Sequence, residues 1–234
     1  MHGLILAGGE GSRLRADGVP VPKPLVSIGD LPQLRRLLDM FQEVGCESTT
    51  CLVRADFRQV AKLLQPGGRG GPHLVWCRTP SSLHTLVEGL RVVPPGPVFC
   101  TMIDTVMRPE DWRATYRETE GHLTAGAALV LVVTPFVDDE SPLYVERDDE
   151  GMVTRIGGEP GISPLVTGGV YGLSERVREE AAAALKAGLH RMRAFLQRVV
   201  QQGHRVATVE IARIIDLDRR RDLEQADAWL RTLH

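Results

Sequence analysis

Short apolar runs alternate with longer amphipathic stretches through the first half of the sequence, and this alternation restricts the fold more than any other feature. The apolar runs predict β-strands, and the stretches that follow them predict α-helices with one apolar face. In chain order the predicted strands are residues 4–7, 49–53, 73–77 and 98–103, and the predicted helices are residues 33–44, 56–64, 83–92 and 110–118. Repeated strand–helix units are typical of a parallel sheet with helices on both faces.

The pattern changes in the second half of the sequence. Predicted strands at 127–133, 143–147 and 152–156 follow one another without helices between them, and the acidic segment 148–151, which ends in glycine, predicts a turn. The remaining predicted elements are helices at 174–186 and 192–202, a strand at 205–211 and a closing helix at 223–230. We therefore expect a mixed, partly antiparallel region in the same domain.

The composition argues against several classes of protein. The 234 residues carry a formal net charge of −2, so neither nucleic acid nor an anionic membrane is expected as a partner. No apolar run approaches the roughly 20 residues that a membrane-spanning helix needs, and the first residues do not resemble an export signal. The cysteines at 46, 51, 77 and 100 match no zinc spacing, which favours buried free thiols in a reducing compartment. These features predict a cytoplasmic protein that acts on small molecules.

A glycine-rich segment follows the first predicted strand and reads GGEGSRLRADGVPVPKPL at residues 8–25. Glycine permits positive φ and close approach of the backbone to a ligand, and successive backbone N–H groups can form a concavity for an anion. Arg13 and Lys23 place positive charge at the two ends of the segment, and the prolines around Lys23 stiffen its backbone. The spacing is neither a dinucleotide-binding fingerprint nor a Walker loop. The segment therefore predicts a phosphate-binding loop of another kind.

The combination LAGGEGSRL followed by PKPL closely resembles the signature of the sugar-phosphate nucleotidyltransferases, including the interval between Arg13 and Lys23. The resemblance implies a Rossmann-like (GT-A type) α/β fold, a three-layer α/β/α sandwich with a mostly parallel central sheet and a small antiparallel region on the acceptor side. It also implies that Arg13 meets the leaving pyrophosphate and that Lys23 meets the α-phosphate at the reaction centre. The residues that would hold the nucleotide are Leu6, Ala7, Gly8, Gly9 and Gly11.

The same resemblance implies one nucleotidyltransferase domain over residues 1–234. Residues 1–120 would form the nucleotide-binding part and residues 121–211 the acceptor-binding part. Residues 212–234 would supply a metal-ligand turn and the closing helix.

Three aspartates are candidates to hold Mg²⁺, which prefers carboxylate oxygens. Asp104 follows the strand at 98–103, and the C-terminal end of a central parallel strand is where such an ion would be held; the resemblance points to the same residue. Asp216 and Asp218 resemble the family's closing Asp-x-Asp element, and in an extended segment they point the same way. Asp216 is predicted to bind the ion directly. Asp218 is a direct ligand, a water-mediated partner or the N-cap of the last helix. The arginines at 219–221 favour a solvated face over a phosphate clamp.

The candidates for base recognition lie at the start of the helix predicted at 83–92. Ser81 and Ser82 stand where relatives contact the base, although two serines at this point would equally serve as helix caps. His84 is either a contact to the base or the acceptor, or a structural polar residue. The departure from the family pattern here leaves the preferred base undefined.

The candidates for acceptor binding are Glu159, Thr167 and Gly168, which resemble two strand elements that line the family's acceptor pocket. The lysine that often grips a sugar phosphate is missing beside Glu159. The sequence offers other residues to replace its charge, but the spacing selects none of them: Arg54, Arg155 and His190.

The sequence as a whole predicts a nucleotidyltransferase that moves a nucleoside monophosphate from an NTP to a phosphorylated small molecule, foremost a sugar 1-phosphate, and releases pyrophosphate. One alternative is a CTP-dependent cytidylyltransferase that acts on phosphocholine or a phosphonate. Another is a catalytically silent nucleotide-binding regulatory subunit. The PKPL element and the length favour the sugar-type group over the molybdenum-cofactor group. A homodimer is compatible with the resemblance.

Overall fold

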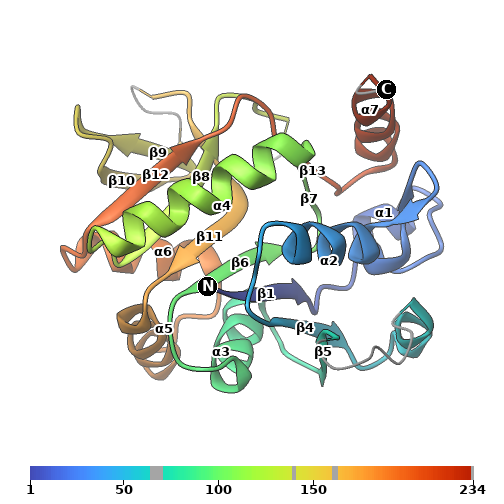
Figure 1. The fold of residues 1–234 in the computed structure, drawn as a ribbon, viewed down its shortest axis with the longest axis horizontal. Coiled ribbons are helices and arrows are strands. Elements are labelled where there is room, and N and C mark those ends of the chain that lie inside the picture. The colour runs from blue at the N-terminus through green and yellow to red at the C-terminus, as the bar shows by residue number, and fades with distance from the viewer. Residues whose placement is uncertain (64–70, 139–140, 160–162, 233–234) are drawn as a thin grey trace.

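The computed structural model describes residues 1–63, 71–138, 141–159 and 163–232, and its centre is a nine-stranded sheet (Figure 1). The strand order is β10-β9-β11-β6-β1-β4-β5, and β8 pairs with both β11 and β12. The strands are β1 (His2–Ala7), β4 (Thr49–Arg54), β5 (His73–Cys77), β6 (Val98–Met102), β8 (Leu129–Thr134), β9 (Tyr144–Arg147), β10 (Val153–Gly157), β11 (Val166–Leu173) and β12 (Val206–Glu210).

The half of the sheet built from the first part of the chain is parallel. β1 pairs in parallel with β4 on one side and with β6 on the other, and β4 pairs in parallel with β5. β11 then runs antiparallel to β6 and β8, and β9 and β10 form an antiparallel pair. The predicted α/β fold, with a mostly parallel sheet and an antiparallel region from the second half, is confirmed.

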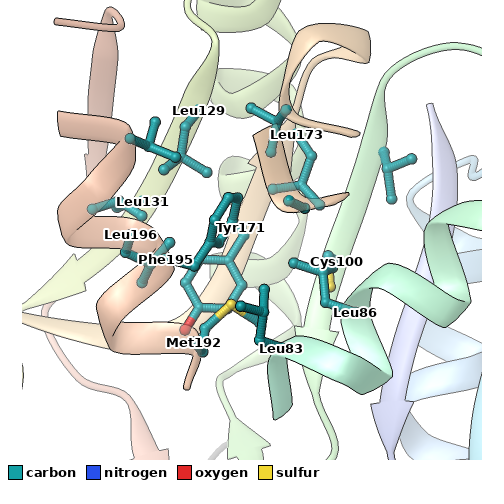
Figure 2. Close-up of a cluster of buried hydrophobic side chains, with 14 of the residues drawn as sticks. Leu83, Leu86, Cys100, Leu129, Leu131, Tyr171, Leu173, Met192, Phe195 and Leu196 are labelled. Atoms are coloured by element: carbon teal, nitrogen blue, oxygen red, sulfur yellow. The ribbon is translucent and has the colours of Figure 1, made fainter. Parts of the chain in front are cut away.

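Helices cover both faces of the sheet and complete three layers. α2 (Gln33–Glu43) and α4 (Pro109–Thr124) cover one face, and α3 (Ser82–Val92), α5 (Glu175–Lys186) and α6 (Met192–Gln201) cover the other (Figure 1). Alternate residues of β1 serve the two layers: Leu4 and Leu6 pack on the α3 side, and Ile5 packs on the α2 side. Figure 2 shows the cluster on the α3 side, with Tyr171 of β11 between side chains of α3 and α6.

Several short elements lie outside these layers, and sequence patterns did not predict them. They gather at one end of the molecule, where α7 (Arg220–Arg231) packs on residues of β2, β7 and β13 (Figure 1). These elements are α1 (Ser12–Ala16), the 3₁₀ helix η1 (Lys23–Leu25), β2 (Ser27–Ile28), β3 (Leu31–Pro32), β7 (Thr105–Val106) and β13 (Ile215–Asp216).

Two predicted helices differ from the structure. The helix predicted at 56–64 is a short 3₁₀ helix, η2 (Arg58–Leu63), and residue 64 lies outside the described residues. The helix predicted at 110–118 is longer, because α4 begins at Pro109, a residue that fits the first turn, and continues to Thr124.

The cysteines are free: Cys51, Cys77 and Cys100 are buried, and Cys46 is half-buried. Burial raises the pKa of Cys51 to about 12, so this thiol stays protonated. Within the described residues, no helix combines the length and the apolar character needed to cross a membrane.

We predict that Gly172→Ala destabilises the fold by about 1–3 kcal/mol, because overpacking a core carries a cost of this size. A Cβ atom at this position of β11 would lie 2.3 Å from Cγ2 of Thr119 and 3.1 Å from Cβ of Val130. Gly121→Ala is the matched control, because nothing lies within 4 Å of its Cβ position on α4. The control should gain roughly 0.5–1 kcal/mol through helix propensity. Urea denaturation measures both changes, and equal stability of the two variants would contradict this packing.

Candidate active site

The glycine-rich loop leads from β1 into α1, and close packing requires glycine at two of its positions. Gly11 has a left-handed conformation with φ of 63°, and a Cβ atom there would lie 3.2 Å from Cγ of Lys23. A Cβ atom on Gly8 would lie 3.1 Å from Oγ1 of Thr85 in α3. The loop therefore lies against α3 on one side and against Lys23 on the other, and larger residues would force both apart.

A cavity of about 280 Å³ lies between the loop and the start of α3, and we call it the loop cavity. It is lined by Leu6, Gly8, Gly9, Glu10, Arg54, Thr79, Pro80, Ser81, Ser82, Thr85 and Met102. Most of the predicted nucleotide-binding residues thus share one cavity. Two of them are placed elsewhere: Ala7 is buried in the core on the α2 side, and Gly11 packs against Lys23.

The serines at the start of α3 connect this helix to the first residue of α6 and to His190 just before it. Ser81 is the N-cap residue, but its side chain makes no capping hydrogen bond. Its hydroxyl instead pairs with Nδ1 of His84 at 2.8 Å and donates to the carbonyl of His190, while Oγ of Ser82 accepts from the backbone N–H of Met192 at 3.2 Å. The rings of His84 and His190 stack with centroids 5.4 Å apart. The start of α3 therefore contacts the start of α6 and also lines the loop cavity.

Lys23 is buried and lies at the centre of an ion-pair network. Its ammonium group donates to Oδ2 of Asp104 at 2.8 Å and to Oδ1 of Asp218 at 2.6 Å, and Arg13 donates to the other oxygen of Asp218. Burial by itself would lower the pKa of Lys23, but attraction to Asp104, Asp216 and Asp218 outweighs it and raises the pKa above its ordinary value. Lys23 is therefore charged at neutral pH, and the network draws Arg13 to the same site.

The three predicted metal ligands come together because a small sheet joins the end of β6 to the C-terminal turn. β7 and β13 pair antiparallel with Asp216 opposite Thr105, and the backbone N–H of Leu217 donates to the carbonyl of Asp104 at 3.0 Å. Ligand oxygens of Asp104, Asp216 and Asp218 lie within 4.8 Å of one another. Such a set of hard oxygen donors fits Mg²⁺, which binds a few carboxylates and retains several waters.

Asp218 does not cap the last helix. Asp222 performs this function, because its carboxylate accepts from the backbone N–H groups of Asp218 at 2.9 Å and Arg219 at 2.6 Å. Burial would raise the pKa of Asp218, but the charges of Lys23 and Arg13 outweigh burial and lower it. The carboxylate of Asp218 is thus ionised and already bonded to two cations.

The arginines that follow Asp218 form more than a solvated face. Arg219 pairs with Asp17 at 3.3 Å, and the guanidinium group of Arg220 donates to the backbone carbonyls of Asp17 and Gly18, each at 3.0 Å. Arg221 approaches Asp138 at 3.7 Å. Arg219 and Arg220 therefore bind the start of α7 to the end of α1, next to the glycine-rich loop.

A second cavity, also of about 280 Å³, adjoins the aspartates, and we call it the β11 cavity. It is lined by Ser82, Met102, Asp104, Ser141, Leu143, Thr167, Gly169, Tyr171, Arg191, Met192, Arg193, Leu196 and Asp216. Ser82 and Met102 also line the loop cavity, so the two cavities meet at the start of α3 and the end of β6.

The predicted acceptor residues are only partly in the β11 cavity. Thr167 lines it, whereas Glu159 is exposed outside its lining, and the Cβ position of Gly168 faces Ile214 at 2.2 Å. Gly168 therefore has a packing role, because a side chain there would displace Ile214.

The basic candidates weighed from the sequence lie outside the lining of the β11 cavity. Arg54 lines the loop cavity, Arg155 pairs with Glu146 at 2.8 Å, and His190 stacks on His84. Sequence reasoning missed Arg191 and Arg193, which do line the cavity. The sequence placed these arginines at the start of the helix predicted at 192–202, but it gave no indication that they would line a cavity.

Comparison with known proteins places this geometry in a family. Residues 3–206 match the family described as the MobA-like NTP transferase domain. The chain belongs to this family. The glycine loop, Lys23 and Asp104 all fall within the matched residues, whereas Asp216 and Asp218 lie beyond them.

Curated relatives include sugar-phosphate enzymes. The chain is 25% identical over 185 residues to mannose-1-phosphate guanylyltransferase catalytic subunit beta of Drosophila pseudoobscura pseudoobscura, covering 75% of this chain and 48% of the relative. It is 28% identical over 180 residues to glucose-1-phosphate thymidylyltransferase of an Actinoplanes strain, covering 73% and 57%. The chain thus spans about half the length of these relatives.

Solved structures support the fold. The inositol-1-phosphate CTP transferase from T. maritima superposes with a TM-score of 0.80 at 16% identity, covering 98% of this chain and 96% of that one. At this identity the likeness concerns the fold alone, and it agrees with the predicted GT-A type architecture.

We predict that Lys23→Met increases the affinity for Mn²⁺, in the absence of nucleotide, by at least about tenfold, since unit charges 4 Å apart interact by about 4 kcal/mol near a protein surface. The ammonium group of Lys23 occupies oxygens of Asp104 and Asp218 that a divalent ion would use. Asp104→Asn should weaken Mn²⁺ binding, and Lys186→Met, at an exposed position of α5, should leave it unchanged. Electron paramagnetic resonance titration measures free Mn²⁺, and unchanged affinity in Lys23→Met would contradict the shared use of these carboxylates.

Proposed function

We propose that this protein transfers a nucleoside monophosphate from an NTP to a phosphorylated small molecule, with a sugar 1-phosphate as the first candidate acceptor, and releases pyrophosphate with Mg²⁺ as cofactor. The observation that carries the proposal is the junction of the two cavities beside the network of Lys23, Asp104 and Asp218. One cavity lies over the glycine-rich loop and the other contains carboxylates of the candidate metal site. Two substrates could therefore meet at one charged point.

The loop cavity suits the nucleotide. Backbone N–H groups of the loop can receive phosphate oxygens, and Lys23 lies directly behind Gly11. Arg13, which contacts Asp218, would receive the departing pyrophosphate near the same point. Both side chains would exchange carboxylate partners for phosphate oxygens when the nucleotide binds.

The proposed reaction needs no covalent enzyme intermediate. An oxygen of the acceptor phosphate attacks the α-phosphorus in line, the bond from the α-phosphorus to the bridging oxygen of the β-phosphate breaks, and pyrophosphate leaves with that electron pair. A phosphate monoester with a second pKa of about 6 is already ionised at neutral pH, so no general base is required. Lys23 and Arg13 orient the phosphates and stabilise the developing charge. Mg²⁺ held by Asp104 and Asp216, with Asp218 as a direct or water-mediated partner, would add charge neutralisation.

The acceptor class is inferred from the relatives named above, which act on sugar 1-phosphates according to their names. In this proposal residues 1–120 form the nucleotide-binding part, residues 121–211 the acceptor-binding part, and residues 212–234 the metal-ligand turn and closing helix. Ser82 and Met102 line both cavities and would contact both substrates, and Asp104 would reach the acceptor from the first part.

Pyrophosphate release tests the proposal directly. ATP, CTP, GTP, UTP and dTTP would each be combined, in the presence of Mg²⁺, with pools of sugar 1-phosphates, phosphocholine and phosphonates. Release that requires one NTP and one sugar 1-phosphate supports the proposal. Release only with CTP and phosphocholine or a phosphonate would show that the acceptor is one of these compounds and not a sugar 1-phosphate. NTP binding without release in any combination would favour the regulatory subunit and contradict the proposed reaction.

We predict that Asp104→Ala lowers turnover by at least about 10²-fold, the size of effect seen when one preorganised electrostatic group is removed from a transition state. The fold should persist with lower stability, because Lys23 keeps Asp218 as a partner. The backbone bonds of Ile103 to Leu6 and of Leu217 to residue 104 do not use the Asp104 side chain. Asp39→Ala is the control, since within the described residues Asp39 pairs with Arg35 at an exposed place on α2 and lines neither cavity. Initial rates with circular dichroism of both variants measure the effect, and near wild-type turnover of Asp104→Ala would remove Asp104 from the mechanism.

A further inference from the structure

We propose that Arg191 and Arg193 bind the anionic group of the acceptor in the β11 cavity, in place of the lysine that this chain lacks. The inference rests on the proposed function and specifies the acceptor side of the same site. It also defines the ligand class as a small phosphate monoester or a small phosphonate.

The charges that line the β11 cavity require a cationic side. Asp104 and Asp216 are both part of its lining and are assigned to the metal ion, so they offer no cationic contact of their own to an acceptor dianion. Among the described lining residues, the cationic side chains are Arg191 and Arg193. The ammonium group of Lys23 is engaged by Asp104 and Asp218 and lines neither cavity.

Within the described residues, neither guanidinium group has a carboxylate partner. Arg191 is exposed, and its side chain forms no ion pair or hydrogen bond within the described parts of the chain. Arg193 donates to the backbone carbonyl of Ser141 at 2.9 Å, a neutral acceptor that leaves its charge uncompensated. By contrast, Arg155 and Arg147 on the neighbouring strands pair with Glu146 and Glu210. The positive charge at the start of α6 is therefore available to a ligand, and guanidinium groups match phosphate oxygens in a bidentate geometry.

The backbone that carries the two arginines is fixed in place. Met192, between them, is buried, and its backbone N–H donates to Oγ of Ser82 at the junction of the two cavities. Figure 2 shows Met192, Phe195 and Leu196 of α6 facing Tyr171 of β11. Ser81 and the stacked histidine pair hold the preceding residue, His190. A preorganised backbone reduces the entropy lost when the arginines bind an anion.

The rest of the cavity fits a small hydroxylated or polar body. Three of its lining residues carry hydroxyl groups: Ser141, Thr167 and Tyr171. Burial, with the nearby Cys100, Asp104 and Asp216, raises the pKa of Tyr171 well above its ordinary value, so its hydroxyl remains a neutral donor. The volume of about 280 Å³ is sufficient for a compact molecule.

Ligand binding to variants tests this assignment apart from turnover. Isothermal titration calorimetry would use glucose 1-phosphate, phosphocholine and 2-aminoethylphosphonate as probes, with Mg²⁺ and an NTP analogue with a non-hydrolysable α,β linkage present. Arg191→Ala and Arg193→Ala should each weaken the probe that binds the wild type by about 10- to 100-fold, the range for a charged hydrogen bond. Affinity for the NTP analogue should stay unchanged, and Arg191→Lys should retain part of the probe affinity.

The matched control is Arg176→Ala, which removes an exposed arginine from the neighbouring helix α5 and should bind every probe as the wild type does. Unchanged probe affinity in Arg191→Ala together with Arg193→Ala would overturn the assignment, as would failure of every probe to bind the wild type. Arginine-dependent probe binding without pyrophosphate release would uphold the assignment while the proposed reaction fails. Turnover with an unchanged KM for the acceptor in the double variant would uphold the reaction and overturn the assignment.

Discussion

The buried ammonium group of Lys23, held between Asp104 and Asp218, is the interaction on which the site depends. Burying an ion costs several kcal/mol even in real proteins, and removing one partner of a buried pair costs about 3–5 kcal/mol. Both carboxylates therefore stabilise the buried charge of Lys23. These carboxylates lie 81 and 195 residues further along the chain, so a single charge joins the glycine-rich segment, the end of β6 and the C-terminal turn.

The architecture places Asp104, a partner of this charge, in the lining of the β11 cavity, which meets the loop cavity at Ser82 and Met102. β1 and β6 are parallel neighbours, so the loop after one and the aspartate after the other emerge at the same edge of the sheet. β11 runs antiparallel beside β6 and brings Thr167 and Tyr171 to the second cavity. Ser82 at the start of α3, which is bonded to Met192 of α6, and Met102 at the end of β6 form the wall that the cavities share. A nucleotide and an acceptor could thus approach the same carboxylates from opposite sides of this wall.

Local patterns were sufficient to predict the sheet and its layers, because apolar runs are properties of neighbouring residues. The grouping of Asp104 with Asp216 and Asp218 was predicted from the resemblance to the sugar-phosphate nucleotidyltransferases, since these residues lie far apart in the sequence. The roles of Arg219 and Arg220 were not predictable, since their partners Asp17 and Gly18 lie about 200 residues away. Ser81 and Ser82 illustrate the same limit, because a serine before a helix suggests a cap. In the structure their hydroxyl groups instead form hydrogen bonds with the backbone of His190 and Met192. Arg191 is a further case, because only the packing of α6 against α3 brings it to the β11 cavity.

A crystal structure with Mg²⁺ and an NTP analogue with a non-hydrolysable α,β linkage would show where the nucleotide and the ion bind. We expect the base in the loop cavity, the α-phosphate on the ammonium group of Lys23, and the ion on Asp104 and Asp216. A nucleotide bound elsewhere would contradict the account, for example in the cavity of about 850 Å³ that Arg36, Arg113 and Arg231 line beside α7. An ion that binds without Asp104 would contradict it equally.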